Sequence, residues 1–449
     1  MTSRRLPITM SMLMIVAVLL ALTVAGCERP ASNTGTAPRV LLIGIDGLDW
    51  ERATGMIDEG RLPNLALLID EGSSGVLHSV YPYLSPAIWT SIATGKVEEK
   101  HSIHGFLVDR GLTSNPTPTS SDMREARAFW QILSDGGYTV GVTGWLVTWP
   151  AEIINGYMVS SRISTLLRDV GDPTGKDAQL EKMRRGTHPQ GMLDDLLDLK
   201  IMHTDLTDDD IFRFLGTDTM PELDEARSRR DDIGRFYASD LTSLRMADHL
   251  IESVPTELVA LYLRGLDLSC HTFWKFMEPD VWPDSISPEM LDTFGPVIER
   301  YYGVADSMIG ELLKHRGPET VVIICSDHGF AGHRGYPGFD GELAVGISMH
   351  REDGIIVMSG PGIRRNGRIE DASILDVTPT LLALFDLPVG RDMDGRVLTD
   401  AMETDFLDAH PLTSVESHER GEDEDGSEPI SSTVDEEVLE RLRSLGYIE

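Results

Sequence analysis

Short apolar runs of strand length alternate along this chain with segments of helical periodicity. Apolar runs of about four to eight residues are typical of strands that are buried on both faces. Their alternation with helices predicts an α/β fold, in which a mostly parallel sheet is covered by helices on both faces. The predicted strands are 39–46, 75–81, 139–143, 258–263, 320–325 and 355–358, and the predicted helices are 62–71, 86–94, 127–134, 297–315 and 378–387.

Two stretches depart from this alternation. From about 163 to 250 the chain is rich in charged residues, Met and Leu, and few runs resemble strands, so we expect a mainly helical insertion in a domain spanning 39–400. The tail, 401–449, is acidic and polar over 414–432, a composition typical of disorder. Helical periodicity returns over 436–447 and predicts a C-terminal helix.

The N-terminus has the composition of an export signal. Arg4 and Arg5 precede an apolar run over 10–24, which is short for a membrane span. The small residues V-A-G before Cys27 resemble a bacterial lipobox, and an uncleaved anchor helix is the alternative. We therefore expect a signal peptide over 1–26, lipidation of Cys27, a flexible tether over 27–38, and a protein anchored through lipid at the cell envelope, periplasmic or on the outer face.

The charge of the chain limits its partners. A formal net charge of −34 repels nucleic acid and anionic membranes, so we expect no nucleic-acid polymer as a partner. A small anionic substrate stays compatible with this charge if metal ions supply local positive charge. Besides Cys27, Cys270 and Cys325 are expected to be buried small residues, and a single bond between them stays open.

Residues of the type that binds metal ions stand at the ends of the predicted strands. Asp46 follows the first strand, Asp267 and His271 follow 258–263, Asp327 and His328 follow 320–325, and His350 precedes 355–358. Open α/β sheets bind ligands at the carboxyl ends of their strands, and carboxylates with imidazoles suit divalent metals. Each residue alone has a structural explanation, such as a turn or a helix cap. Together they predict a metal centre.

A series of motifs contains these residues in a fixed order. They are LLIGIDGLDW (41–50), YPYLSPAIWTSIATGK (81–96), WPAEIINGYMVSS (149–161), the Asp267/His271 pair, SDHG (326–329), His350 with GIIVMSGPGI, and DVTPTLLALFDLPVGRDMDGRVL (376–398). In this order they resemble the alkaline phosphatase superfamily, and more closely its type I phosphodiesterase/nucleotide pyrophosphatase branch. The resemblance covers roughly 39–400 apart from the insertion.

The resemblance implies an alkaline-phosphatase-like, doubly wound sheet with two divalent metal ions, usually zinc. One ion would be held by Asp46, Asp327, His328 and the Ser85 oxygen, and the other by Asp267, His271 and His350. The implied reaction is hydrolysis of a phosphodiester or pyrophosphate bond, in which Ser85 attacks phosphorus and a phospho-serine intermediate is then hydrolysed. Metal coordination would activate the serine hydroxyl, which is otherwise a poor nucleophile.

Several alternatives stay open on the same scaffold. A phosphomonoesterase, a phosphonate hydrolase or a phosphotransferase would use the same residues, whereas the Cys/Ser-x-Pro-x-Arg signature of sulfatases is absent around Ser85. A non-catalytic, membrane-tethered binding protein is the contrasting class. The ligand set also accepts manganese or iron. Lys96, His333 and Arg334 are the predicted contacts to a small phosphate-ester substrate.

Overall fold

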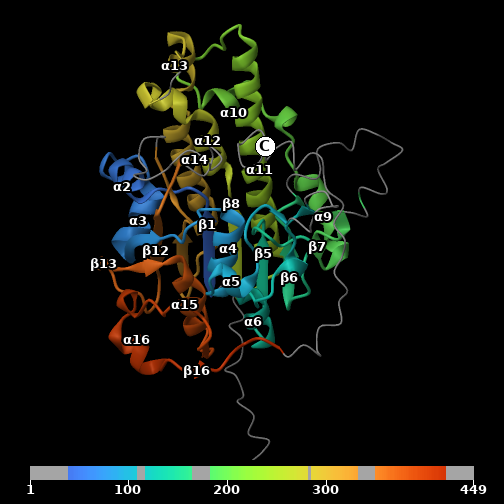
Figure 1. The fold of residues 1–449 in the computed structure, drawn as a ribbon, viewed down its shortest axis with the longest axis vertical. Helices are drawn as coiled ribbons and strands as arrows, with labels where there is room; N and C mark the ends of the chain where they lie inside the picture. Colours follow the sequence, from blue (N-terminus) through green and yellow to red (C-terminus); the bar gives the residue numbers. More distant parts are fainter. Residues whose placement is uncertain are drawn as a thin grey trace, which may run out of the picture. The chain divides into compact units, whose positions relative to one another are not determined.

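A ten-stranded, mostly parallel sheet forms the centre of the described structure (Figure 1). The structure is a computed structural model and describes residues 39–108, 117–163, 180, 183–281, 285–331 and 349–420. The strand order is β13-β2-β12-β9-β1-β8-β5-β6-β7, and β14 also pairs with β2. The strands are β1 (Val40–Ile45), β2 (Ser73–His78), β5 (Val140–Thr143), β6 (Gly156–Val159), β7 (Thr187–His188), β8 (Leu258–Leu263), β9 (Val321–Cys325), β12 (Asp353–Ser359), β13 (Gly367–Arg368) and β14 (Ala372–Ser373).

The middle of the sheet is buried on both faces. Strand β1 pairs in parallel with β8 on one side and β9 on the other, and all six of its residues are buried. Leu41, Ile43 and Ile45 contribute to one apolar core, whereas Val40 and Leu42 contribute to the other. Successive side chains of a strand point to opposite faces, so a continuous apolar run such as VLLIGI supplies both cores.

Helices cover each face of this sheet, as the sequence predicts. Together with the strand pairing, this confirms the predicted α/β class. The core that contains Leu41 includes residues of α2 (Trp50–Asp58), α3 (Pro63–Glu71), α10 (Asp208–Phe212), α11 (Asp224–Ser253), α12 (Gly265–Met277), α13 (Pro288–Phe294) and α14 (Val297–Leu312). The core that contains Val40 includes residues of α4 (Ser85–Thr94), α6 (Phe129–Asp135) and α15 (Val377–Leu384), with α16 (Thr404–Ala409) packed against it.

A third, smaller core lies beside the β6 edge and contains residues of the predicted insertion. Leu193 and Leu196 of α9 (Leu193–Leu196) pack there with Met246 and Leu250 of α11. Helix α11 is thirty residues long, and it also contributes to the larger core against the sheet. The predicted insertion therefore ends in a helix that is part of one of the two layers. The domain boundaries stay predictions.

The structure differs from the sequence-based prediction in two local respects. Strand β12 runs antiparallel to both β9 and β2. Helix α4 begins at Ser85, one residue before the predicted start, with Leu84 as its N-cap and no side-chain capping bond, so Ser85 does not cap the helix. The predicted signal peptide, Cys27, the tether and the C-terminal helix lie outside the described residues. Within the described ranges, no helix combines the length and the apolar character needed to cross a membrane.

Shorter elements complete the described structure. The two-residue strands outside the central sheet form three small pairs, and α5 follows α4 directly. These elements are α5 (Glu98–His101), β3 (Leu107–Val108), β4 (Thr117–Pro118), β10 (Gly329–Phe330), β11 (His350–Arg351), β15 (Val389–Gly390) and β16 (Ser414–Val415).

Candidate metal centre and nucleophile

Strand pairing brings the predicted ligands to one edge of the sheet. Ile45 pairs with Leu263, and Gly44 with Cys325, so β1, β8 and β9 end at the same level. Asp46 follows β1 directly, Asp327 and His328 follow β9 after one residue, and Asp267 and His271 lie in the first two turns of α12, the helix that follows β8. Strand β12 runs antiparallel to β9, so His350, which precedes it, is at this edge too. Strand β2, which leads to Ser85, also ends there, since His78 pairs with Asp353.

Asp46, Asp327 and His328 form a fully buried group with Asp267. His328 Nε2 is 3.4 Å from Asp46 Oδ1, 3.4 Å from Asp327 Oδ2 and 3.9 Å from Asp267 Oδ1. The Gly47 N–H donates to Asp327 Oδ1 at 3.3 Å and links the turns that follow β1 and β9. Asp46, Asp267 and His328 place their donor atoms close enough to hold one ion.

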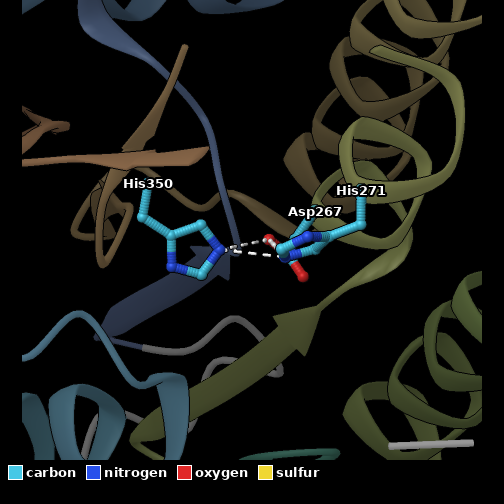
Figure 2. A group of neighbouring side chains, drawn as sticks. All are labelled: Asp267, His271 and His350. Carbon is cyan, nitrogen blue, oxygen red and sulfur yellow. Dashed lines mark hydrogen bonds and ion pairs between the residues drawn. The ribbon is translucent and has the colours of Figure 1, made fainter. Parts of the chain in front are cut away.

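Asp267, His271 and His350 form a second group (Figure 2). Asp267 and His271 lie four residues apart on α12, a spacing that puts both on one face of a helix. His350 approaches from the opposite side, and its Nε2 is 2.9 Å from His271 Nε2 and 3.5 Å from Asp267 Oδ1. These three residues are the set that the family resemblance implies for one ion.

The two groups share Asp267, which the sequence assigned to one ion alone. Its Oδ1 is 3.2 Å from His271 Nε2 and lies within reach of His328 as well. The rings of His328 and His350 stack with centroids 3.7 Å apart, which joins the groups directly. The six side chains therefore form one continuous cluster.

Backbone carbonyls orient two of the imidazoles. The Nδ1–H of His350 donates to the Tyr83 carbonyl at 2.8 Å, and that of His328 donates to the Gly329 carbonyl at 3.0 Å. Each bond turns Nε2 of its ring toward the carboxylates. Metal-binding histidines characteristically use their second nitrogen in this way.

Electrostatics give this cluster the character of a cation site. Burial raises the pKa of Asp46 well above its usual value, and the neighbouring carboxylates of Asp327 and Asp267 raise it further. Burial also raises the pKa of Asp327 to about 7, and it lowers the pKa of His328 well below the ordinary range. Burial acts to raise the pKa of Asp267 as well, but His271 and His350 beside it hold that pKa below its usual range.

Unpartnered polar atoms support the same conclusion. Asp46 Oδ1, Asp327 Oδ2 and His328 Nε2 are buried and have no hydrogen-bond partner among the described residues. Leaving such atoms unpaired costs about 1–3 kcal/mol each, and more for charged groups. Carboxylate oxygens and imidazole nitrogens are the donors that zinc and similar divalent ions take. The residues present therefore fit the metal ions that the sequence predicts.

Ser85 is the first residue of α4, and its hydroxyl has no structural partner. Its Oγ is buried and makes no hydrogen bond within the described part of the chain. The Tyr83 carbonyl, two residues earlier, accepts from His350, so this turn contacts the second ligand group. Trp89, one turn along α4, packs on Tyr262 with ring centroids 4.8 Å apart, and the Tyr262 hydroxyl donates to Asp46 Oδ2. Both contacts hold the start of α4 against the cluster.

The contacts of Lys96 indicate a structural role, and its predicted contact to substrate stays a prediction. Lys96 lies beyond the C-terminal end of α4, about 15 Å along the helix axis from Ser85. Its Nζ pairs with Asp392 and Glu419, each at 2.6 Å. His333 and Arg334, the other predicted contacts, lie outside the described residues.

Sequence reasoning missed the residues that support the ligands. Tyr262 is bonded to Asp46, and Asp240 of α11 accepts from the Gly265 N–H at the start of α12. A tyrosine near the end of a strand and an aspartate inside a helix carry no local signal of such a role. Their partners lie 216 and 25 residues away in the chain.

Comparison with known proteins places the chain in a family. No curated protein sequence matched it. Among solved structures it is similar to a 2-O GAG sulfatase, with 13% identity and a TM-score of 0.49 over 85% of this chain and 76% of that chain. It is also similar to a mutant of the alkaline phosphatase PafA, with 14% identity and a TM-score of 0.48 over 83% of this chain and 100% of that chain. A phosphonoacetate hydrolase from Sinorhizobium meliloti 1021 is similar with 17% identity and a TM-score of 0.37 over 66% of this chain and 57% of that chain. The family model described as type I phosphodiesterase / nucleotide pyrophosphatase matches residues 40–377. The chain therefore belongs to the type I phosphodiesterase / nucleotide pyrophosphatase family, and this membership indicates a phosphoester hydrolase.

Proposed function

We propose that this protein hydrolyses phosphodiester or pyrophosphate bonds in a small substrate, using Ser85 and two divalent metal ions, with zinc as the first choice. The observation that carries the proposal is the cluster of three carboxylates and three imidazoles at the sheet edge where α4 presents Ser85. Within the described residues, four of these side chains have a buried polar atom without a hydrogen-bond partner, namely Asp46, Asp267, Asp327 and His328. The proposed ligands are Asp46, Asp327 and His328 with the Ser85 oxygen for one ion, and Asp267, His271 and His350 for the other.

The protein's own residues would then perform the following steps. Bound metal ions lower the pKa of a coordinated hydroxyl and neutralise negative charge that develops on phosphate oxygens. Ser85 Oγ gives its proton to solvent water and attacks phosphorus, the bond from phosphorus to the leaving-group oxygen breaks, that oxygen departs and takes up a proton from water, and a phospho-serine forms. A water molecule then attacks the same phosphorus, the bond to Oγ breaks, and the serine is restored.

The start of α4 favours the same chemistry. A helix N-terminus attracts phosphate through its dipole and its amide groups. In this turn Pro86 has no N–H, and the Ala87 and Ile88 N–H groups donate to the Leu84 carbonyl. Among the described residues no backbone acceptor is seen for the Ser85 N–H, so this amide could donate to a phosphate oxygen, and the metal ions must supply most of the positive charge.

The test is turnover of bis-p-nitrophenyl phosphate and of p-nitrophenyl phosphate, extended to pyrophosphate esters, by zinc-loaded and chelator-treated protein. We expect the diester or a pyrophosphate to be preferred and the chelator to remove the activity. A preference for the monoester would replace the diesterase assignment with a phosphomonoesterase. Tight zinc binding without turnover of any ester would favour a tethered binding protein.

We also propose that the protein is exported and anchored by lipid at Cys27, a proposal that rests on the N-terminal sequence alone. A Cys27→Ala variant is expected to leave the membrane fraction and to stop incorporating labelled fatty acid. Continued sedimentation of the variant with membranes would support the uncleaved anchor helix instead.

A further inference from the structure

Asp49 is a fully buried carboxylate beside the metal cluster that is not one of the proposed ligands. It follows Asp46 by three residues. Its Oδ2 accepts from the Phe330 N–H at 3.1 Å and from Arg351 Nη2 and Nε at 2.7 Å and 3.2 Å. Phe330 is two residues beyond His328, and Arg351 directly follows His350. One oxygen therefore joins three segments that carry proposed ligands.

The second oxygen of Asp49 fixes the carboxylate itself. Asp49 is the N-cap of α2, and its Oδ1 accepts from the Arg52 N–H at 2.9 Å. Its own N–H donates to the Tyr302 hydroxyl at 3.2 Å. These bonds leave the carboxylate little freedom to rotate, so the position of Oδ2 is set by α2 and α14.

The segments that meet at Oδ2 are also paired with each other. In the antiparallel pair of β10 and β11, Phe330 lies opposite His350, and Gly329 lies opposite Arg351. The Asp49 carboxylate packs so closely under this pair that a Cβ added to Gly329 would lie 2.4 Å from Oδ2. A shift of Asp49 would therefore move the backbone beside both His328 and His350.

The charge of Asp49 is offset within the same contact. An isolated carboxylate here would add a fourth negative charge near Asp46, Asp267 and Asp327. Arg351 pairs with Asp49 at 2.7 Å and with the exposed Glu51 at 3.2 Å. Arginine suits this role because its planar guanidinium presents two nitrogens to one carboxylate.

We propose that Asp49 and Arg351 form a positioning pair that sets metal affinity by holding the Asp46, His328 and His350 segments in register with one another. This inference rests on the metal centre of the proposed function, but it concerns binding and is independent of which ester is hydrolysed. Loss of residues that orient metal ligands typically weakens metal binding by about 10–100-fold.

The experiment measures zinc affinity by competition with a chromophoric chelator, using full-length wild type and three variants. Asp49→Asn keeps the size of the side chain but removes its charge and one acceptor. Arg351→Gln removes the partner from a half-exposed position, where loss of folding is not expected. Asp306→Asn is the matched control, because Asp306 is a buried carboxylate that accepts from the Asn64 and Leu65 N–H groups at the start of α3, and neither α3 nor α14 carries a proposed ligand.

We expect zinc affinity to fall by about tenfold or more in Asp49→Asn and by a smaller factor in Arg351→Gln, while Asp306→Asn loses thermal stability but stays within about threefold of wild type. Unchanged affinity in Asp49→Asn would overturn the proposal. If Asp49→Asn does not fold, unchanged zinc affinity in Arg351→Gln would overturn the proposal instead. An equal loss in the control would show general destabilisation and would also overturn it.

The outcomes separate this inference from the proposed function. A wild-type protein that binds zinc but hydrolyses no ester would overturn the proposed function. The zinc affinities of the variants would still decide whether Asp49 and Arg351 form a positioning pair. A wild-type protein that binds no divalent ion would overturn both.

Discussion

Ser85 offers a test of the nucleophile that is nearly free of structural side effects. Its Oγ neither caps α4 nor bonds any described residue, so Ser85→Ala should change the free energy of unfolding little. If Ser85 attacks phosphorus, the variant should lose about 10³-fold or more in kcat while still binding zinc. Steady-state turnover and zinc titration measure the two effects.

Ser91 is the matched control on the same helix. Its Oγ is 2.9 Å from His101 Nε2. Ser91→Ala should therefore cost about 1 kcal/mol of stability and leave kcat near that of wild type. Activity retained in Ser85→Ala, with turnover lost in Ser91→Ala, would contradict the assignment of the nucleophile.

His101 is a buried histidine whose hydrogen bonds give it a structural role. The Ile103 N–H donates to its Nδ1 at 3.2 Å, so the proton of the neutral ring is on Nε2, which faces Ser91 Oγ. Protonation of Nδ1 would place its N–H against the Ile103 N–H, so that two hydrogen-bond donors would face each other. Burial, together with the charge of Arg124, lowers the pKa of His101 to about 3.

This depressed pKa predicts a loss of stability in mild acid. The unfolded chain takes up a proton near pH 6.5 and the folded protein does not, so the contribution is present above pH 6.5 and is lost as the pH falls toward 3. Between pH 7 and 5 this amounts to about 2 kcal/mol. Urea denaturation at both pH values should show a smaller decrease for His101→Gln than for wild type, and equal decreases would contradict the prediction.

At the scale of elements, Lys96 joins helix α4 to the segment that follows β16. Its buried Nζ contacts Asp392 and Glu419, and Glu419 also accepts from the Arg127 N–H. Burial acts to lower the pKa of Lys96, but these two carboxylates outweigh it and raise that pKa. The contacts indicate a structural role, in which the end of α4 is held against β15 and α6.

A substitution of Lys96 distinguishes a structural role of this residue from a role in substrate binding. Lys96→Met leaves two half-exposed carboxylates without their cation, so we expect a loss of about 1–3 kcal/mol in unfolding free energy. KM should stay within about twofold of wild type, because the residue is remote from Ser85. Unfolding and steady-state kinetics provide both values. A large rise in KM at unchanged stability would instead support the predicted contact between Lys96 and substrate.

The elements show which features a sequence reveals and which it does not. Strand β8 was predictable to the residue because an unbroken apolar run ends at charged Arg264, and the ligands stood out because such runs end in Asp and His. The antiparallel direction of β12 was not predictable, since the direction of a strand leaves no trace in its composition. Asp49 was missed because its partners Phe330 and Arg351 lie 281 and 302 residues away.

At the scale of the whole molecule, the buried carboxylates couple metal binding to folding. The strand ends at which Asp46, Asp267 and Asp327 lie belong to the central strands β1, β8 and β9, so repulsion there acts on the middle of the sheet. In the metal-free protein this repulsion is relieved by protonation, as the raised pKa values of Asp46 and Asp327 indicate. Bound cations would relieve it without a proton.

In the metal-free protein, the contribution of these carboxyl groups to stability should therefore fall with rising pH. A carboxyl group whose pKa is higher in the folded than in the unfolded chain stabilises the fold at low pH, and this contribution is lost as the pH rises through the folded pKa. For Asp327, with a pKa of about 7 in the folded protein, the loss between pH 5 and 8 is about 3 kcal/mol. Urea denaturation with excess chelator and with excess zinc should show a stabilisation by zinc that is larger at pH 8 than at pH 5. If zinc stabilised the protein equally or less at pH 8 than at pH 5, the carboxylates would not be the groups that couple metal binding to folding.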